Sequence, residues 1–266
     1  MDIVSILSDS LAYAQEALID KWVKWAIFII LAIPMSLIQF VINPKTIMTG
    51  STVNWAAIPW AQIAVLSALG FFLSFFISGY IVRIYRGIKP APEFTEWADL
   101  FFDGIRLTVV WLLWFLPLII VLASGVAIVF VSSHSLRSVT PNITLLLGVL
   151  LTIFLELVLL VVVVFFGILG AIRFARTGSI REGIRVSKIL ARIQSMGWLS
   201  YILSLLVAGV AAIIYIVITA ILSVLPFIGW IVVLIVSPIF TVFIARYFTL
   251  IYEQGEPRPV LPGSPG

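Results

Sequence analysis

The sequence predicts an all-α membrane protein, a polytopic bundle of six transmembrane helices with amphipathic helices lying in the plane of the membrane. Three observations predict this fold class. Hydrophobic residues make up 62% of the 266 residues and charged residues only 11%, whereas soluble domains average about 25% charged residues. Six apolar runs each approach or exceed the length needed to cross a bilayer, about 20 residues. The basic residues gather in alternate connecting segments, as the topology of a membrane protein requires.

The chain divides into three predicted parts. Residues 1–21 are expected to form an N-terminal amphipathic surface helix, because apolar residues recur there at nearly helical spacing between acidic ones. A secretory signal would begin with positive charge instead. Residues 22–252 form the predicted six-helix transmembrane domain, and residues 253–266 a Pro/Gly-rich C-terminal tail. The spans are expected at about 22–41, 58–82, 107–131, 143–172, 198–222 and 227–250.

The distribution of positive charge predicts the orientation of the helices. All but two of the 16 basic residues fall on one side of the predicted bundle, and the exceptions are Lys45 and Arg137. The positive-inside rule makes the basic side cytoplasmic. We therefore expect a multi-pass protein of the plasma membrane with both termini in the cytoplasm. Asn142 begins a glycosylation sequon on the opposite side, although its position at a helix start makes access poor.

The segment that follows the second span is predicted to be an in-plane helix with one apolar and one acidic face. Apolar residues repeat every three or four positions from Phe94 to Ile105, and acidic residues occupy the opposite arc. Pro90 and Pro92 keep the second span from continuing into this helix. We call residues 79–106 the signature segment.

A later segment has the same order of parts with basic residues in place of acidic ones. The basic stripe, spaced by four, three and four residues, consists of Arg181, Arg185, Lys188 and Arg192. One interpretation is that the basic stripe binds anionic lipid headgroups, with a binding free energy of about 1 kcal/mol per basic residue. The other is that these residues serve only to set the topology. A third alternative is that the acidic and basic helices pair with each other, although exposed pairs contribute only about 0–1 kcal/mol each.

The two charged segments also predict a degenerate internal repeat. Both contain an acidic residue followed by Gly-Ile-Arg, at residues 103–106 and 182–185. Both follow a helix that ends in Gly and two Arg residues three positions apart, and both precede another span. The shared order of parts favours a duplication of the unit formed by a span, a surface helix and a further span.

The signature segment resembles that of an archaeal family of multi-pass membrane proteins catalogued as a domain of unknown function. The resemblance rests on Gly79, Tyr80, Arg83 and Arg86, followed by Pro92, Phe94, Trp97, Asp99, Leu100, Phe101, Asp103 and Gly104. It implies an archaeal plasma-membrane location and carries no catalytic residues. The layout is also loosely similar to the membrane domain of some glycerophosphodiester phosphodiesterases, whose catalytic domain has no counterpart here.

One acidic residue, Glu156, lies deep in a predicted span. An ionised carboxylate near the middle of a bilayer costs several kcal/mol, so Glu156 must be protonated, paired or hydrated. It is either a proton or cation site in a transport path or a neutral, hydrogen-bonded side chain that packs against a neighbouring helix. Thr152, one turn away, is its nearest polar neighbour in the sequence.

Composition also limits the chemistry that the chain can perform. The absence of cysteine excludes disulfides and thiolate metal sites, and the single histidine, His134, cannot build a zinc site alone. We expect no enzyme activity, no cofactor or metal, and no nucleic-acid partner. The leading hypothesis is a scaffold, accessory subunit or lipid-interacting organiser that contacts membrane lipids and a protein partner at its cytoplasmic surface. The alternative is a transporter or channel for small solutes or ions that uses Glu156.

Overall fold

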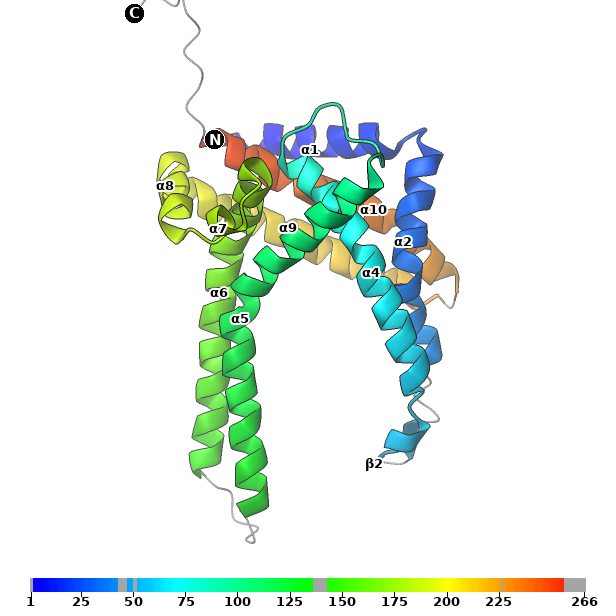
Figure 1. Cartoon of the computed structure of the whole chain (residues 1–266), viewed down its shortest axis with the longest axis vertical. Coiled ribbons are helices and arrows are strands. Elements are labelled where there is room, and N and C mark those ends of the chain that lie inside the picture. Colours follow the sequence, from blue (N-terminus) through cyan, green and yellow to red (C-terminus); the bar gives the residue numbers. More distant parts are fainter. Residues whose placement is uncertain (1, 43–46, 50–51, 136–142, 226, 256–266) are drawn as a thin grey trace, which may run out of the picture.

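The computed structural model describes residues 2–42, 47–49, 52–135, 143–225 and 227–255 of the chain (Figure 1). A short antiparallel pair, β1 (Met48–Thr49) and β2 (Thr52–Val53), and a 3-10 turn at Trp55–Ala57 lie between the helices α2 (Trp22–Val41) and α4 (Trp60–Tyr85). The helices are α1 (Ile3–Leu18), α2 (Trp22–Val41), α4 (Trp60–Tyr85), α5 (Trp97–Ser135), α6 (Ile143–Thr177), α7 (Ile180–Gly183), α8 (Val186–Met196), α9 (Trp198–Ser223) and α10 (Ile228–Gln254).

Six helices of the described part of the chain are long and apolar enough to cross a membrane: α2, α4, α5, α6, α9 and α10. They confirm the predicted fold class, an all-α polytopic bundle. Their apolar side chains are largely uncovered. In the most apolar stretch of α5, α6 and α9, only 6% of the residues are buried inside the protein. A surface of exposed Leu, Ile and Val this large belongs against lipid rather than water, which indicates a membrane protein.

The helices form two pairs joined by crossing helices (Figure 1). α2 and α4 lie side by side, and α5 first crosses α4 and then runs along α6. α5 changes direction partway along its length. It contains Pro117, which removes a backbone hydrogen bond and is a common cause of such bends. α9 and α10 pass behind the other helices, and α1 lies across one end, packed mainly on α10.

We call this end of the bundle the polar end. It holds α1, the connection between α4 and α5, α7 and α8. One face of α1 is buried there, through Ile6, Ser10, Tyr13, Ala14, Ala17 and Leu18. The side chain of Asp2 accepts hydrogen bonds from the amides of Val4 and Ser5, so it caps the first turn of α1.

The signature segment differs from the predicted arrangement. The sequence predicts an in-plane helix that precedes a separate span starting at residue 107, but α5 is continuous from Trp97 to Ser135. No proline occurs between Pro92 and Pro117 to end a helix. The predicted acidic helix and the third span are therefore one continuous helix. Asp99 and Asp103 lie on its first two turns, whereas Glu93 and Glu96 precede it.

The segment that carries the basic stripe from Arg181 to Arg192, which we call the basic segment, also differs from the prediction, because it is not one helix. α7 ends at Gly183, and α8 begins at Val186 after Arg185 in a non-helical conformation. Gly183 lies against α6, where an added Cβ would come 2.9 Å from the Cβ of Phe174. The chain turns at this contact, so Arg181 and Lys188 belong to different helices and the single narrow stripe is broken.

Candidate functional site

The crossing of α4 and α5 depends on two glycines of the signature segment. A Cβ added to Gly79 would lie 1.9 Å from the carbonyl oxygen of Leu100, and one added to Gly104 would lie 1.8 Å from that of Phe75. Both contacts are with backbone, which cannot move aside without moving its helix. The two glycines therefore set how closely the helices approach.

Aromatic rings fix the chain between these two helices. Tyr80 stacks on Phe94 with ring centroids 4.6 Å apart, and Phe94 in turn stacks on Trp97 at 5.8 Å. Phe28 of α2 meets both Tyr80 and Phe94 edge to face. The aromatic signature residues therefore pack the α4–α5 connection onto α2.

Arg83 organises the same connection from inside. Its side chain is 8% exposed. One guanidinium nitrogen donates to the carbonyl oxygen of Glu93 at 3.0 Å and to the hydroxyl of Thr95 at 3.3 Å, and another donates to Glu96 at 3.1 Å. The fork geometry of arginine suits it to hold several acceptors at once.

Asp103 binds two further arginines at the other side of this connection. Its carboxylate, 8% exposed, lies 2.7 Å from Arg86 and 3.7 Å from Arg106. Arg106 follows one turn later on α5, and Arg86 is the C-cap residue of α4. One buried acid thus joins the end of α4 to the first turns of α5.

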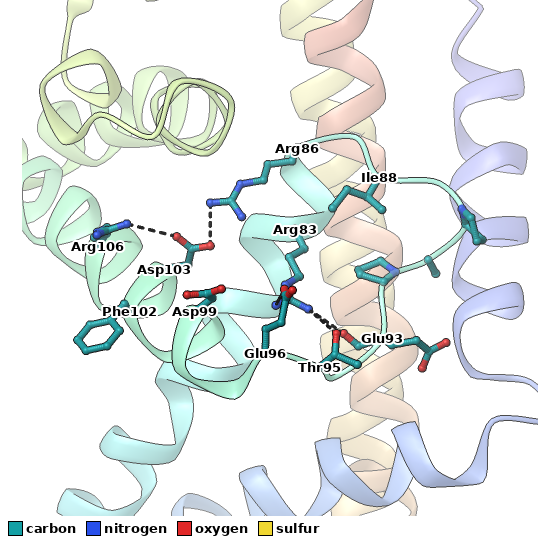
Figure 2. A pocket seen from close by; sticks show the side chains of 13 residues that line it. Arg83, Arg86, Ile88, Glu93, Thr95, Glu96, Asp99, Phe102, Asp103 and Arg106 are labelled. Atoms are coloured by element: carbon teal, nitrogen blue, oxygen red, sulfur yellow. Dashed lines mark hydrogen bonds and ion pairs between the residues drawn. The ribbon is translucent and has the colours of Figure 1, made fainter.

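These residues surround an open cleft of about 790 Å³ at the polar end, which we call the signature cleft (Figure 2). Arg83 lies at its base beside Glu96, while Asp103, Arg86 and Arg106 form one end. Asp99 and Phe102 are exposed at its rim. The cleft presents acidic groups on the α5 side and guanidinium groups beside them, so it can bind a ligand that carries both charges or a basic surface.

The basic segment repeats the same contacts. Glu182 pairs with Arg173, near the end of α6, and with Arg185 three residues later at 2.9 Å. Asp103 likewise pairs with an arginine of the preceding helix and with one three residues later. The glycine contact recurs as well, because a Cβ added to Gly170 would lie 2.3 Å from the carbonyl oxygen of Gly183.

The ends of α4 and α6 bind each other reciprocally. Arg86 donates from Nε to the carbonyl oxygen of Ala175 at 3.3 Å, and Arg176 donates from Nε to that of Tyr85 at 2.8 Å. The last carbonyls of a helix have no partner within the helix, and cations are favoured beside them. Arg176 also pairs with Glu253 of α10 at 2.5 Å. The two carbonyl acceptors lie about ninety residues from their arginines in the sequence, so the local pattern of charges could not reveal these contacts.

The basic stripe has three different environments. Arg181 and Lys188 are exposed, and Arg185 is paired with Glu182. Arg192 packs its guanidinium over the ring of Tyr252 at 4.4 Å, close to the end of α10. Arg181 and Lys188 are therefore free to meet lipid headgroups, while Arg192 contributes to packing within the protein.

Acid should loosen the basic segment in a defined pH range. Hydrogen bonds from Arg173 and Arg185 lower the pKa of Glu182 below its usual 4.5. A group with a lowered folded-state pKa contributes stability above its unfolded pKa and loses it as the pH falls through the folded value. We expect the melting temperature to fall below about pH 4.5, and Glu182→Gln to flatten that part of the profile. An unchanged profile in the variant would contradict this assignment.

Glu156 lies half-buried on α6, in the pair that α6 forms with α5. Its Oε1 is buried and has no hydrogen-bond partner among the described residues. Thr152, one turn before it, donates to the carbonyl oxygen of Gly148 and packs against Gly125. The described neighbours therefore give Glu156 no polar relay.

Other sequence predictions fall outside what the structure describes. Lys45, Arg137, Asn142 and Arg258 lie in segments without a described structure, and the side chain of His134 is not described. Within the described residues, no group of three or more His, Cys, Asp and Glu side chains is placed to hold a metal ion.

Comparison with known proteins gives one family. No curated protein and no solved structure matches the chain significantly. The model of a family described as "Protein of unknown function (DUF4013)" matches residues 62–225, more than half of the chain. The match includes the signature segment, the basic segment and most or all of each helix from α4 to α9. The chain therefore belongs to the DUF4013 family of proteins of unknown function.

Proposed function

We propose that the protein is a non-enzymatic membrane scaffold or accessory subunit that binds a protein partner in the signature cleft. The observation that carries this proposal is the convergence of the signature residues on one open, charged cleft. Their buried members, Arg83 and Asp103, hold the walls in place. The exposed members at the rim, Glu96 and Asp99, are the groups that a partner with basic side chains would meet.

Crosslinking in the native membrane tests this proposal. A photo-crosslinking residue in place of Phe102, which is 56% exposed in the cleft, should capture a discrete protein. Asp99→Lys in the same protein should reduce that capture at least about tenfold, because it places a cation where a basic partner docks. Asp9→Lys, an equally exposed reversal on α1, is the matched control. If the crosslinking yield is the same in Asp99→Lys as in the control, or if no protein is crosslinked at position 102, the cleft is not a docking site.

The polar end is proposed to face the cytoplasm, as the positive-inside rule requires. The chain has no cysteine, so single cysteines report topology without background. We expect Lys188→Cys to resist a membrane-impermeant maleimide in intact cells and to react in inverted vesicles. Trp55→Cys, exposed beyond the opposite end of α4, should do the reverse. Matching accessibility at both positions would contradict the threading.

Transport through the bundle is the second candidate, and it rests on the unpartnered Oε1 of Glu156. A carboxylate used for transport needs a hydrated path or a proton relay. Flux of protons and monovalent cations into proteoliposomes distinguishes the two candidates. Flux by the wild type that Glu156→Gln abolishes would establish transport, and an absence of flux with cleft-dependent crosslinking would favour the scaffold.

We further infer that the signature and basic segments arose by internal duplication. The parallel acid–arginine pairs and the parallel glycine contacts support this inference, as does the mutual capping of α4 and α6. Contact of Arg181 and Lys188 with anionic lipid remains part of the proposal, along with in-plane positions for α1 and α8. The archaeal origin and the loose similarity to phosphodiesterase membrane domains stay predictions.

A further inference from the structure

Arg246 of α10 carries a buried charge without a counter-ion among the described residues. It is the largest fully buried side chain, with 1% of its surface exposed. Its Nε and Nη1 are buried and have no hydrogen-bond partner in the described part of the chain. Buried guanidinium N–H groups without acceptors carry a high desolvation cost in a folded protein. Such a group calls for an acceptor beyond the residues that the structure describes.

α1 covers Arg246 on the side of the polar end. The ring of Tyr13 lies 4.9 Å from the guanidinium carbon, and the Tyr13 hydroxyl donates to the carbonyl oxygen of Ile88 at 2.9 Å. Ala14 and Ala17, both fully buried, belong to the same face of α1. Since α1 packs extensively on α10 and only slightly on α2, it acts as a cover over Arg246.

The neighbouring acids do not neutralise this charge. The negative charges of Glu16 and Glu253 reach Tyr13, but Glu16 is exposed on α1 and Glu253 pairs with Arg176 at 2.5 Å. Tyr13 cannot supply a phenolate, because burial raises its pKa to about 12 even with Arg246 opposing the rise. Arg246 therefore has no paired anion among the described residues.

Further unused donors belong to the helices around Arg246. The Tyr80 hydroxyl of α4 and the Trp25 indole nitrogen of α2 are buried without a partner among the described residues. Both helices, α2 and α4, pack on α10. The buried, unpaired guanidinium of Arg246 favours an oxyanion as its acceptor, and the unused donors on the two neighbouring helices are consistent with a polar ligand there.

We propose that Arg246 binds a phosphate group beneath α1, with α1 as its cover. Phosphate oxygens accept hydrogen bonds from a guanidinium strongly. The site lies at the polar end, where lipid headgroups would meet the helices, so the phosphate comes from an anionic lipid or from free phosphate. This site is separate from the signature cleft and does not depend on the proposed partner.

The melting temperature of the full chain in a neutral maltoside detergent tests the site. Three additions are compared at matched ionic strength: inorganic phosphate, a short-chain phosphatidic acid, and the corresponding diacylglycerol, with chloride as the reference. A saturating phosphate probe should raise the melting temperature by about 5 °C. Arg246→Gln should lose this rise, while Lys89→Gln, an exposed change at the same end, should keep it.

The outcomes separate the two sources of phosphate. A rise with inorganic phosphate supports a site for free phosphate, and a rise with phosphatidic acid alone supports a lipid headgroup. No rise with either probe, or the same rise in Arg246→Gln and the wild type, overturns the proposal. If Arg246→Gln does not fold, the response of the wild type is compared with that of Arg246→Lys, which keeps the charge and should keep most of the rise.

Cysteine labelling tests the role of α1 without changing Arg246. Ala14→Cys would be the single thiol of a chain without native cysteine, and it reacts with a maleimide only when α1 lifts. Bound phosphate neutralises the charge beneath α1, so labelling should slow at least about threefold when the effective probe is added. Faster or unchanged labelling with that probe would overturn the covered-site geometry.

Discussion

Replacing Gly104 with alanine should cost at least about 3 kcal/mol of stability, the upper range for overpacking. The added Cβ would lie 1.8 Å from the carbonyl oxygen of Phe75, so α4 and α5 must separate along their whole crossing. Gly79→Ala, with its 1.9 Å approach to Leu100, should behave alike. We expect either variant to lower the melting temperature by about 6–12 °C, measured by the fluorescence of the nine tryptophans.

Gly209→Ala is the control for this prediction. Gly209 lies inside α9, and an added Cβ would meet nothing within 4 Å. Alanine is the better helix former by about 0.5–1 kcal/mol, so the control should melt at the same temperature or slightly higher. Equal melting temperatures for Gly104→Ala and Gly209→Ala would show that α4 and α5 do not cross this closely.

Arg83→Met should destabilise the protein by about 2–3 kcal/mol, the second largest effect that we expect. The change removes the donors that hold Glu93, Thr95 and Glu96 and leaves the carbonyl oxygen of Glu93 without that bond. Methionine keeps much of the apolar length of the side chain, so the loss reports the hydrogen bonds rather than a cavity. The amides of residues 93–96 should exchange hydrogen faster, since the wall of the signature cleft loses its support.

Glu96→Gln provides the matched comparison. The Glu96 side chain is 71% exposed, and exposed ion pairs contribute about 0–1 kcal/mol. We therefore expect a loss below about 1 kcal/mol and unchanged exchange at Glu93. Equal losses in the two variants would mean that the single ion pair, rather than the backbone contact of Arg83, holds the connection.

The signature segment was predicted only in part from the sequence. Its apolar and acidic periodicity predicted a helix, and α5 does begin at Trp97. The same periodicity did not show whether the helix continues into the third span. The residues near Arg106 neither force the helix to end nor require it to continue. The spacing of Arg181 to Arg192 likewise predicted one stripe, and the contact of Gly183 with α6 interrupts it. A contact of this kind joins residues on two different helices, so the spacing of residues within one helix does not predict it.

The burial of Arg246 could not be predicted from the sequence. The sequence placed it in the last predicted span near the basic side, where it could reach Glu156 only if the two helices adjoined. Its burial comes with the packing of α1, a helix more than 200 residues earlier in the chain, across α10, and the side chain is left 1% exposed. Burial is a property of the packed fold, so a pattern within one segment cannot reveal an unpaired charge.

The sequence alone determined the fold class, because hydrophobic length and the distribution of charge act locally along the chain. The described residues contain six helices that are long and apolar enough to cross a membrane, the number that the sequence predicted. Only the tertiary structure decided which arginine holds which acid, where the signature cleft opens and which cation α1 covers. Those features depend on how closely the helices approach, and that approach is set by pairs of groups such as Gly79 with Leu100 that meet only after the chain has folded.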